Sequence, residues 1–249
     1  TTGDRNTAMG YLALSTMTTV ADNTAVGYKA MTANTSGSNN TAVGKDAMLA
    51  NTTGANNVAI GQNALETSTS GGANTAVGQL AAQDLTTGAE NTAIGHEAGN
   101  NITTGTNNTL LGHEAGTDAV ANVVASNGNI VIGNNYSASA KIKIDWTVTS
   151  DLRDKTEIES VPHGLNFVNQ ITPIKYRFKT SRENDTPNGV TRYGFKAQEI
   201  LALEGENPVL VDNGDTDNLK LTGAYLLPVL VNAIKELKAR IEVLENEWS

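Results

Sequence analysis

A pentapeptide close to Asn-Thr-Ala-Val-Gly recurs through the first half of the chain, and it constrains the fold more than any other feature. Successive copies begin 17 residues apart, and an eighth, displaced copy occupies residues 129–133. A strict period of this length indicates a repeat architecture in which each unit stacks on the next. The seven copies in phase begin at Asn6, Asn23, Asn40, Asn57, Asn74, Asn91 and Asn108.

Each repeat unit has the composition of one coil with a very short strand. An apolar pair such as Ala42 and Val43 is followed by a glycine, Gly44, and by residues suited to turns. The glycine can adopt a positive φ angle, and a second glycine, such as Gly54, marks the opposite turn. Since one coil cannot bury a core alone, we predict a parallel β-rod with one coil per repeat over residues 6–133.

The side chains expected to face the interior of the rod are mostly Ala, Val and Ile, which are small. At about 25 cal/mol per Å² of apolar surface, one thin coil would bury too little to offset its ordering entropy. We therefore expect chains to share a core in a three-fold rod. The composition also permits a disordered linker rich in Gly, Ser, Thr and Asn, but the strict phase argues against it.

Two features within the rod raise the question of ligands. The repeat stacks His96 over His113 and Glu97 over Glu114, an alignment that a metal ladder would use. A polar surface turn explains it better, so we predict no metal site; we also expect the aligned asparagines to form hydrogen-bond ladders rather than a glycan site. Other repeats place at the histidine position Tyr11, Tyr28, Lys45, Gln62 and Gln79.

The composition changes near residue 150. All five prolines follow that point, which predicts a repeat fibre region over residues 1–149 and a different domain over residues 150–249. The net charge of −9 includes no basic stripe, so nucleic acid is not an expected partner. No run approaches the roughly 18 to 20 apolar residues that cross a bilayer, so membrane insertion is not expected. The chain has no cysteine, and no cofactor is predicted.

The second region opens with a motif that follows a predicted strand at residues 141–148. This motif is Ser-Asp-x-Arg-x-Lys, and a second motif, Gly-Phe-x-Ala-Gln-Glu, follows later; together they contain Ser150, Asp151, Arg153, Lys155, Gly194, Phe195, Gln198 and Glu199. With these two motifs, residues 150–249 resemble the intramolecular chaperone domain of phage tailspikes and tail fibres, also classified as peptidase family S74. The 17-residue repeats are likewise similar to repeats of trimeric adhesin heads and of phage tail fibres.

This resemblance implies an auto-endopeptidase that cuts the bond between Thr149 and Ser150. It assigns Ser150 as the nucleophile and Lys155 as the base that activates it. The chemistry is consistent, because a serine hydroxyl needs a base, and lysine can serve when desolvation or a nearby cation lowers its pKa. We expect Asp151 to orient Lys155 or to strain the turn, and Arg153 to position a carboxylate or the developing oxyanion.

The same residues also permit a purely structural interpretation. Ser150 and Asp151 can cap the N-terminus of a helix, and Asp154 and Glu157 then favour its dipole. Lys155 would in that case be an ordinary solvated charge. The two interpretations are compatible, because a nucleophile can lie at a helix N-terminus.

The C-terminal segment predicts a helix with a coiled-coil pattern. Apolar residues alternate at spacings of three and four, while charged residues occupy the other faces. Such a helix either joins chains into a homotrimer or packs on its own domain; we predict the trimer, which would align the registers of three rods. The residues of this pattern are Leu230, Ile234, Leu237, Ile241 and Leu244.

Together these features predict the distal part of a phage tail fibre or tailspike, folded in the host cytoplasm and carried on the virion. A host-cell surface receptor or glycan is the expected partner. The alternative is the non-enzymatic head of a trimeric bacterial surface adhesin, which would need a C-terminal membrane anchor. A depolymerase would need a pair of carboxylates on a groove, which the sparse acids of the rod do not provide. Because Thr1 falls within the repeat, we expect a piece of a longer chain.

Overall fold

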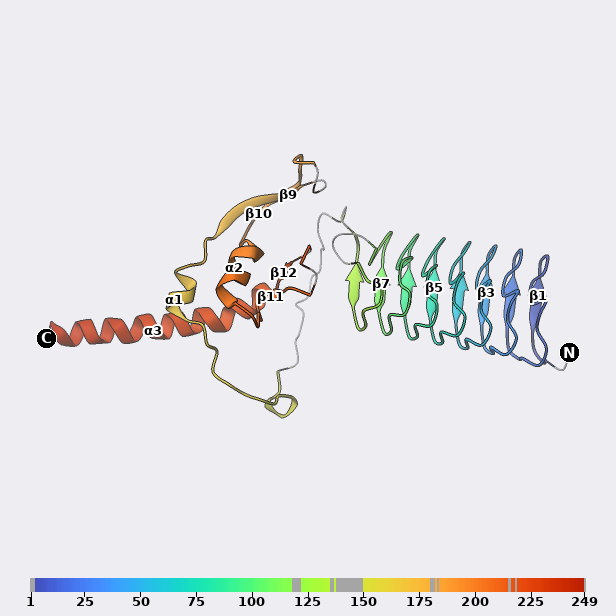
Figure 1. The fold of residues 1–249 in the computed structure, drawn as a ribbon, viewed down its shortest axis with the longest axis horizontal. Helices are drawn as coiled ribbons and strands as arrows, with labels where there is room; N and C mark the ends of the chain where they lie inside the picture. The colour runs from blue at the N-terminus through green and yellow to red at the C-terminus, as the bar shows by residue number, and fades with distance from the viewer. Residues whose placement is uncertain are drawn as a thin grey trace. The chain divides into compact units, whose positions relative to one another are not determined.

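A computed structural model describes residues 3–117, 122–134, 137, 150–179, 182, 184–214, 216–217 and 219–248. The chain divides into two compact units, Thr1–Ser137 and Ala138–Ser249 (Figure 1). The strand predicted at residues 141–148 and the predicted cleavage residue Thr149 lie outside the described residues.

The first unit is a solenoid built from eight strands of three residues each, stacked in sequence order in one parallel sheet (Figure 1). From the first strand to the seventh, residues 17 apart face each other; Ala25, for example, pairs with Ala42. The predicted parallel rod with one coil per repeat is therefore confirmed. The strands are β1 (Thr7–Met9), β2 (Thr24–Val26), β3 (Thr41–Val43), β4 (Val58–Ile60), β5 (Thr75–Val77), β6 (Thr92–Ile94), β7 (Thr109–Leu111) and β8 (Ile130–Ile132).

The displaced eighth repeat joins the same sheet. Thr109 of β7 pairs with Ile130 of β8, so the step between these strands is longer than the others but the register is kept. Within the longer connection, Thr117 and Asn122 form an isolated antiparallel bridge. The strand pairing is intact because the additional length falls outside the strands.

The apolar core lies inside the coils of this one chain. In the strands from β2 to β7 only the middle residue is buried, because side chains alternate along a strand. Ala42 and Ala59 are fully buried in this way, whereas Ile60 and Ile94, the last residues of their strands, are 41% and 42% exposed. The expectation that Val and Ile of the motif face inward is wrong. The stacked coils together bury a continuous apolar core. Its other buried members include Ala47, Ala64, Met31, Met48, Leu65, Leu85 and Ile102.

Glycines meet two different requirements in each coil. Gly44, which follows a strand, has a φ of +143°, as predicted for a corner. Gly54, at the opposite turn, does not have a positive φ, but a Cβ there would lie 2.3 Å from the carbonyl oxygen of Gly71 in the next coil. This position requires glycine because adjacent coils approach so closely. The sequence did not reveal that other corners use left-handed non-glycine residues, including Asp46 and Met48 with φ of 55° and 50°.

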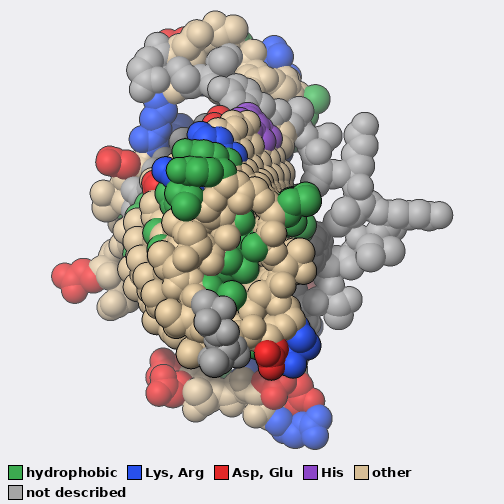
Figure 2. Space-filling model, turned by 90° about the vertical axis from the view of Figure 1, so that its right-hand side faces the viewer, with side chains coloured by type: hydrophobic (Ala, Val, Ile, Leu, Met, Phe, Trp, Pro, Cys, Tyr) green, Lys and Arg blue, Asp and Glu red, His purple; other side chains and the backbone are tan. Residues whose placement is uncertain are grey.

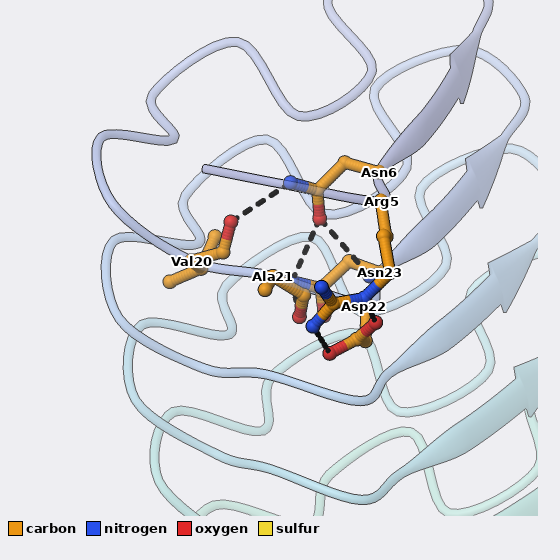
Figure 3. A network of polar contacts seen from close by, with 6 residues as sticks. All are labelled: Arg5, Asn6, Val20, Ala21, Asp22 and Asn23. Atoms are coloured by element: carbon orange, nitrogen blue, oxygen red, sulfur yellow. Dashed lines mark hydrogen bonds and ion pairs between the residues drawn. The ribbon is translucent and has the colours of Figure 1, made fainter. Parts of the chain in front are cut away.

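A buried ladder of asparagines connects every coil to the next, as predicted. The backbone N–H of Asn23 donates to Oδ1 of Asn6 at 3.0 Å, and Asn40 donates in the same way to Asn23. Figure 3 shows the first step of this ladder, beside an ion pair between Arg5 and Asp22. These bonds satisfy backbone groups that the corners would otherwise leave unpaired.

The second unit is a small α+β domain with two antiparallel strand pairs, β9 with β10 and β11 with β12. Its longest element is a C-terminal helix, so the predicted fold class is confirmed for both units; the trimeric state stays a prediction. The elements are η1 (Leu152–Asp154), α1 (Leu165–Val168), β9 (Ile174–Lys179), β10 (Pro187–Gly194), α2 (Ala197–Glu204), β11 (Val211–Asp212), β12 (Lys220–Leu221), η2 (Gly223–Tyr225) and α3 (Leu226–Glu247).

Helix α3 presents two different apolar faces. Its first turns contribute Leu226, Val229 and Ala233 to the core of the domain, which also contains Phe167 and Ile200. The predicted coiled-coil residues do not join that core. They form an exposed row, called here the α3 stripe, of Leu230, Ile234, Leu237, Ile241 and Leu244, with exposed fractions of 41%, 65%, 43%, 53% and 54%.

Candidate active site

The segment after residue 150 folds into one tight turn. Asp151 precedes η1 and caps it, since its Oδ1 accepts the backbone N–H of Arg153 at 2.9 Å. The Arg153 guanidinium also pairs with Oδ2 of the same carboxylate at 2.6 Å. These hydrogen bonds from Arg153 lower the pKa of Asp151 below its usual range. The predicted capping role is therefore confirmed for Asp151.

The turn brings together the two residues predicted to perform the chemistry. Lys155, which follows η1, places its Nζ 2.9 Å from Oγ of Ser150 and 3.2 Å from the Ser150 carbonyl oxygen. The first distance is within the range required for proton transfer between a nucleophile and its base. Five residues of separation suffice because η1 reverses the chain between them.

Asp151 is not arranged to orient Lys155. Its carboxylate is occupied by Arg153, and no hydrogen bond or ion pair joins it to Lys155 in the described part of the chain. The expectation that Arg153 positions a carboxylate agrees with this geometry, since that carboxylate is Asp151. Asp151 and Arg153 thus hold the turn on which Ser150 and Lys155 lie.

The site is open to solvent in the single chain. All residues from 150 to 162 are exposed, including the apolar side chains of Leu152 and Ile158, each 67% exposed. A lysine acts as a base at neutral pH when burial or a nearby cation destabilises its charged form. Within the described residues, nothing excludes water from Lys155.

The second sequence motif forms the junction between β10 and α2. Gly194 ends β10, where a Cβ would meet the Tyr176 ring at 3.0 Å, and Phe195 packs against the domain core. Glu199 pairs with Lys196 at the start of α2, while Gln198 is exposed. No hydrogen bond between this motif and Ser150 occurs among the described residues. The structure therefore gives the motif a role in building the domain.

Two polar residues of α3 that sequence reasoning missed hold the chain that follows the site. Asn232 donates to the carbonyl oxygens of Val161 and His163, and Glu236 accepts the backbone N–H of Leu165. No sequence signal could identify them, because about 70 residues separate the partners and polar residues are common on an exposed helix.

The histidine pair of the rod is stacked as the repeat predicts. The rings of His96 and His113 are 5.1 Å apart and nearly parallel. Within the described residues, no group of three or more His, Cys, Asp or Glu side chains could hold a metal ion. Nor is any helix in that part of the chain long and apolar enough to span a membrane.

The described chain thus consists of a β-solenoid followed by a small α+β domain that opens on a Ser-Lys pair. Residues 150–210 match the family model of the chaperone of endosialidase, Peptidase_S74. This match confirms the resemblance found in the sequence for that segment. Comparisons with curated proteins and with solved structures found no match.

Proposed function

We propose that this chain forms the distal part of a phage tail fibre or tailspike, whose C-terminal domain assembles a homotrimer and then separates itself from the rod. The chaperone domain and the β-solenoid fit a tail-fibre- or tailspike-like protein. The single observation that carries the cleavage is the 2.9 Å contact between Ser150 Oγ and Lys155 Nζ at the start of the matched segment.

Two exposed apolar surfaces support a trimer. The α3 stripe lies outside the core of its own domain, and a neighbouring chain is the occupant that we propose for it. On the solenoid, the last residues of the strands form a second apolar row, including Met9, Ile60, Ile94 and Ile132. Figure 2, which looks on to the N-terminal end of the solenoid, shows hydrophobic side chains on the surface of the coils. Contact between copies would remove both surfaces from water.

The position of the two site residues supports the following reaction. Neutral Lys155 accepts the Ser150 hydroxyl proton while Oγ attacks the carbonyl carbon of Thr149. The resulting tetrahedral intermediate breaks its C–N bond, and Lys155 returns the proton to the departing amino group of Ser150. This N-to-O shift leaves an ester between Thr149 and Ser150, which water hydrolyses to a carboxylate and the free hydroxyl.

Trimer assembly would determine when Lys155 can act as a base. Since Lys155, Leu152 and Ile158 are exposed in one chain, neighbouring chains that cover them would exclude water and favour the neutral amine. Cleavage would then await the folded trimer. After release, unfolding of the rod would be irreversible, because the domain that guides its assembly is gone.

A denaturing gel of the purified full chain, with mass spectrometry of the fragments, tests this function. Cleavage predicts a fragment that ends at Thr149 and one that begins at Ser150. An intact chain from trimeric, folded protein would refute self-cleavage. We further propose that the released rod remains on the virion and contacts a host-cell surface receptor or glycan, which binding of the cleaved rod to host cells would test.

A further inference from the structure

The segment that carries the site has few connections to the folded domain. From residue 150 to residue 160, the hydrogen bonds of the described chain stay within the segment: Arg153 to Asp151, Lys155 to Ser150 and the backbone bonds of η1. The first contacts with another element occur at Val161 and His163. Whatever holds those residues therefore limits where Ser150 and Lys155 can lie.

Helix α3 provides these contacts through two side chains one turn apart. Nδ2 of Asn232 donates to the carbonyl oxygen of Val161 at 3.1 Å and to that of His163 at 3.3 Å. Oε2 of Glu236 accepts the backbone N–H of Leu165 at 2.9 Å. Residues four apart lie on the same helix face, so both side chains bind the same stretch of chain, residues 161–165.

Residues 161–165 have side chains that allow this contact. A Cβ at Gly164 would lie 2.0 Å from Oε1 of Glu236, so the carboxylate occupies the space that a larger residue would need. The ring of His163 stacks on Phe167 at a centroid distance of 4.2 Å, and Phe167 belongs to the domain core. The end of the segment is thus fixed against α3 and the core together.

We propose that Asn232 and Glu236 are positioning residues that tie the Ser150 and Lys155 segment to α3. The inference rests on the cleavage proposed above. Helical periodicity places these two residues on a different face from Leu230, Ile234 and Leu237 of the α3 stripe. The same helix can therefore hold the segment and contact neighbouring chains, so that packing of α3 determines where the site lies.

Chain geometry gives the expected size of the effect. The six residues from Lys155 to Val161 can span at most about 20 Å. Without the two side chains, the nearest fixed residue is buried Leu165, ten residues from Lys155, and the reach grows to about 35 Å. The effective concentration of a tethered group falls roughly as the −3/2 power of tether length, so productive placement becomes about twofold less frequent. Lost orientation would slow cleavage further.

The test compares cleavage rates of full-length variants in pulse–chase expression. We expect Asn232→Ala and Glu236→Ala each to slow cleavage, and the double variant to slow it at least about twofold while the trimer still forms. Gly164→Ala, which lies outside α3, should displace the Glu236 carboxylate and cause a similar loss. Glu236→Gln should recover rate relative to Glu236→Ala, since its amide oxygen can accept the Leu165 N–H. Glu245→Ala, a change to an exposed acid of the same helix, is the control and should match the unmodified chain.

A second measurement does not depend on cleavage. In the Ser150→Ala background, amide hydrogen exchange should be faster at Leu165, whose N–H bonds to Glu236, when Asn232 and Glu236 are both Ala. Unchanged exchange, or a trimeric double variant that cuts at the unmodified rate, overturns the inference. If the unmodified chain is not cut, the proposed cleavage fails, and the exchange result alone then decides whether α3 anchors the segment.

Discussion

Ser150 Oγ and Lys155 Nζ lie 2.9 Å apart because the single turn of η1, capped by Asp151, folds the chain back between them. The pair is thus local: it forms within six consecutive residues and needs no other element. What the local structure does not provide is protection from water, since the whole segment is exposed. The predictions below separate these two requirements.

Replacing either member of the pair should abolish cleavage and leave assembly intact. Ser150→Ala removes the nucleophile, and Lys155→Ala removes the base. Lys155→Arg is the sharper change, because it keeps a positive donor that stays protonated at neutral pH and cannot act as a base. Denaturing gels and light scattering should show uncut trimers for all three. Normal cutting of Ser150→Ala at the same bond would eliminate the proposed mechanism.

Charges in the α3 stripe should prevent both assembly and cleavage. Leu237→Glu combined with Ile241→Glu places two carboxylates on a surface that we expect to be buried between chains. Light scattering should give the monomer mass, and the chain should stay uncut. Lys235→Glu alters the net charge by the same two units on another face of α3 and should remain trimeric. A monomeric double variant that cuts at the normal rate would show that cleavage does not await assembly.

The asparagine ladder should be a main source of solenoid stability. Asn57→Ala removes the acceptor for the backbone N–H of Asn74 and the donor to the Gly71 carbonyl oxygen. Both backbone groups then remain buried without a partner, at a cost of about 2 to 4 kcal/mol in the free energy of unfolding. Denaturant unfolding followed by circular dichroism measures this loss. Asn100→Ala, a partly exposed asparagine with no side-chain hydrogen bond in the described structure, should change stability little.

The second glycine of the repeat should tolerate no side chain. In Gly54→Ala the new Cβ would lie 2.3 Å from the Gly71 carbonyl oxygen and 2.4 Å from Oδ1 of Asn51, so adjacent coils must separate. We expect a loss of about 1 to 3 kcal/mol in unfolding free energy. Gly72→Ala is the matched control, since its nearest neighbour would be 3.1 Å away. Equal effects of the two changes would disprove the close-packing explanation.

The turn of η1 should be insensitive to pH until strongly acidic conditions. Because Arg153 lowers the pKa of Asp151, the pair contributes fully above the unfolded-state value of about 3.9 and is lost as the pH falls through the lower folded value. Carboxyl NMR titration should place the Asp151 midpoint below that of an unfolded peptide of the same sequence. Arg153→Gln should raise it. Any change in cleavage rate between pH 5 and pH 9 must then come from a group other than Asp151.

Periodic features were predictable from the sequence because each coil repeats one local solution. The strand at Thr41–Val43, the corner at Gly44 and the Asn40 ladder all follow from the 17-residue phase. The left-handed conformation of Met48 could not be predicted from this phase. Backbone sterics disfavour that conformation for a large residue, and only the stacking of coils imposes it. The expectation that the Val or Ile after the motif alanine is buried was also wrong, since a three-residue strand buries one residue rather than two.

The site divides in the same way. Ser150 and Lys155 were identified by their motif, and their contact is local in the chain. The partner of Asp151 was not identified, since both a neighbouring lysine and a neighbouring arginine were available to it. The hydrogen bond from Asn232 to the Val161 carbonyl oxygen depends on the packing of α3 against α1, which no local sequence pattern encodes.

The uniformity of the solenoid has a consequence for how chains recognise one another. Its outward apolar row repeats nearly the same side chain at every step, as at Val26, Val43 and Val77. Two such surfaces displaced by one coil would still match along seven of their eight strands. Such a face does not determine the register between two rods, so a pairing shifted by one coil would be almost as favourable as the correct pairing. In the trimer that we propose, the C-terminal domain does not repeat, and its contacts between chains would therefore set the register of the coils.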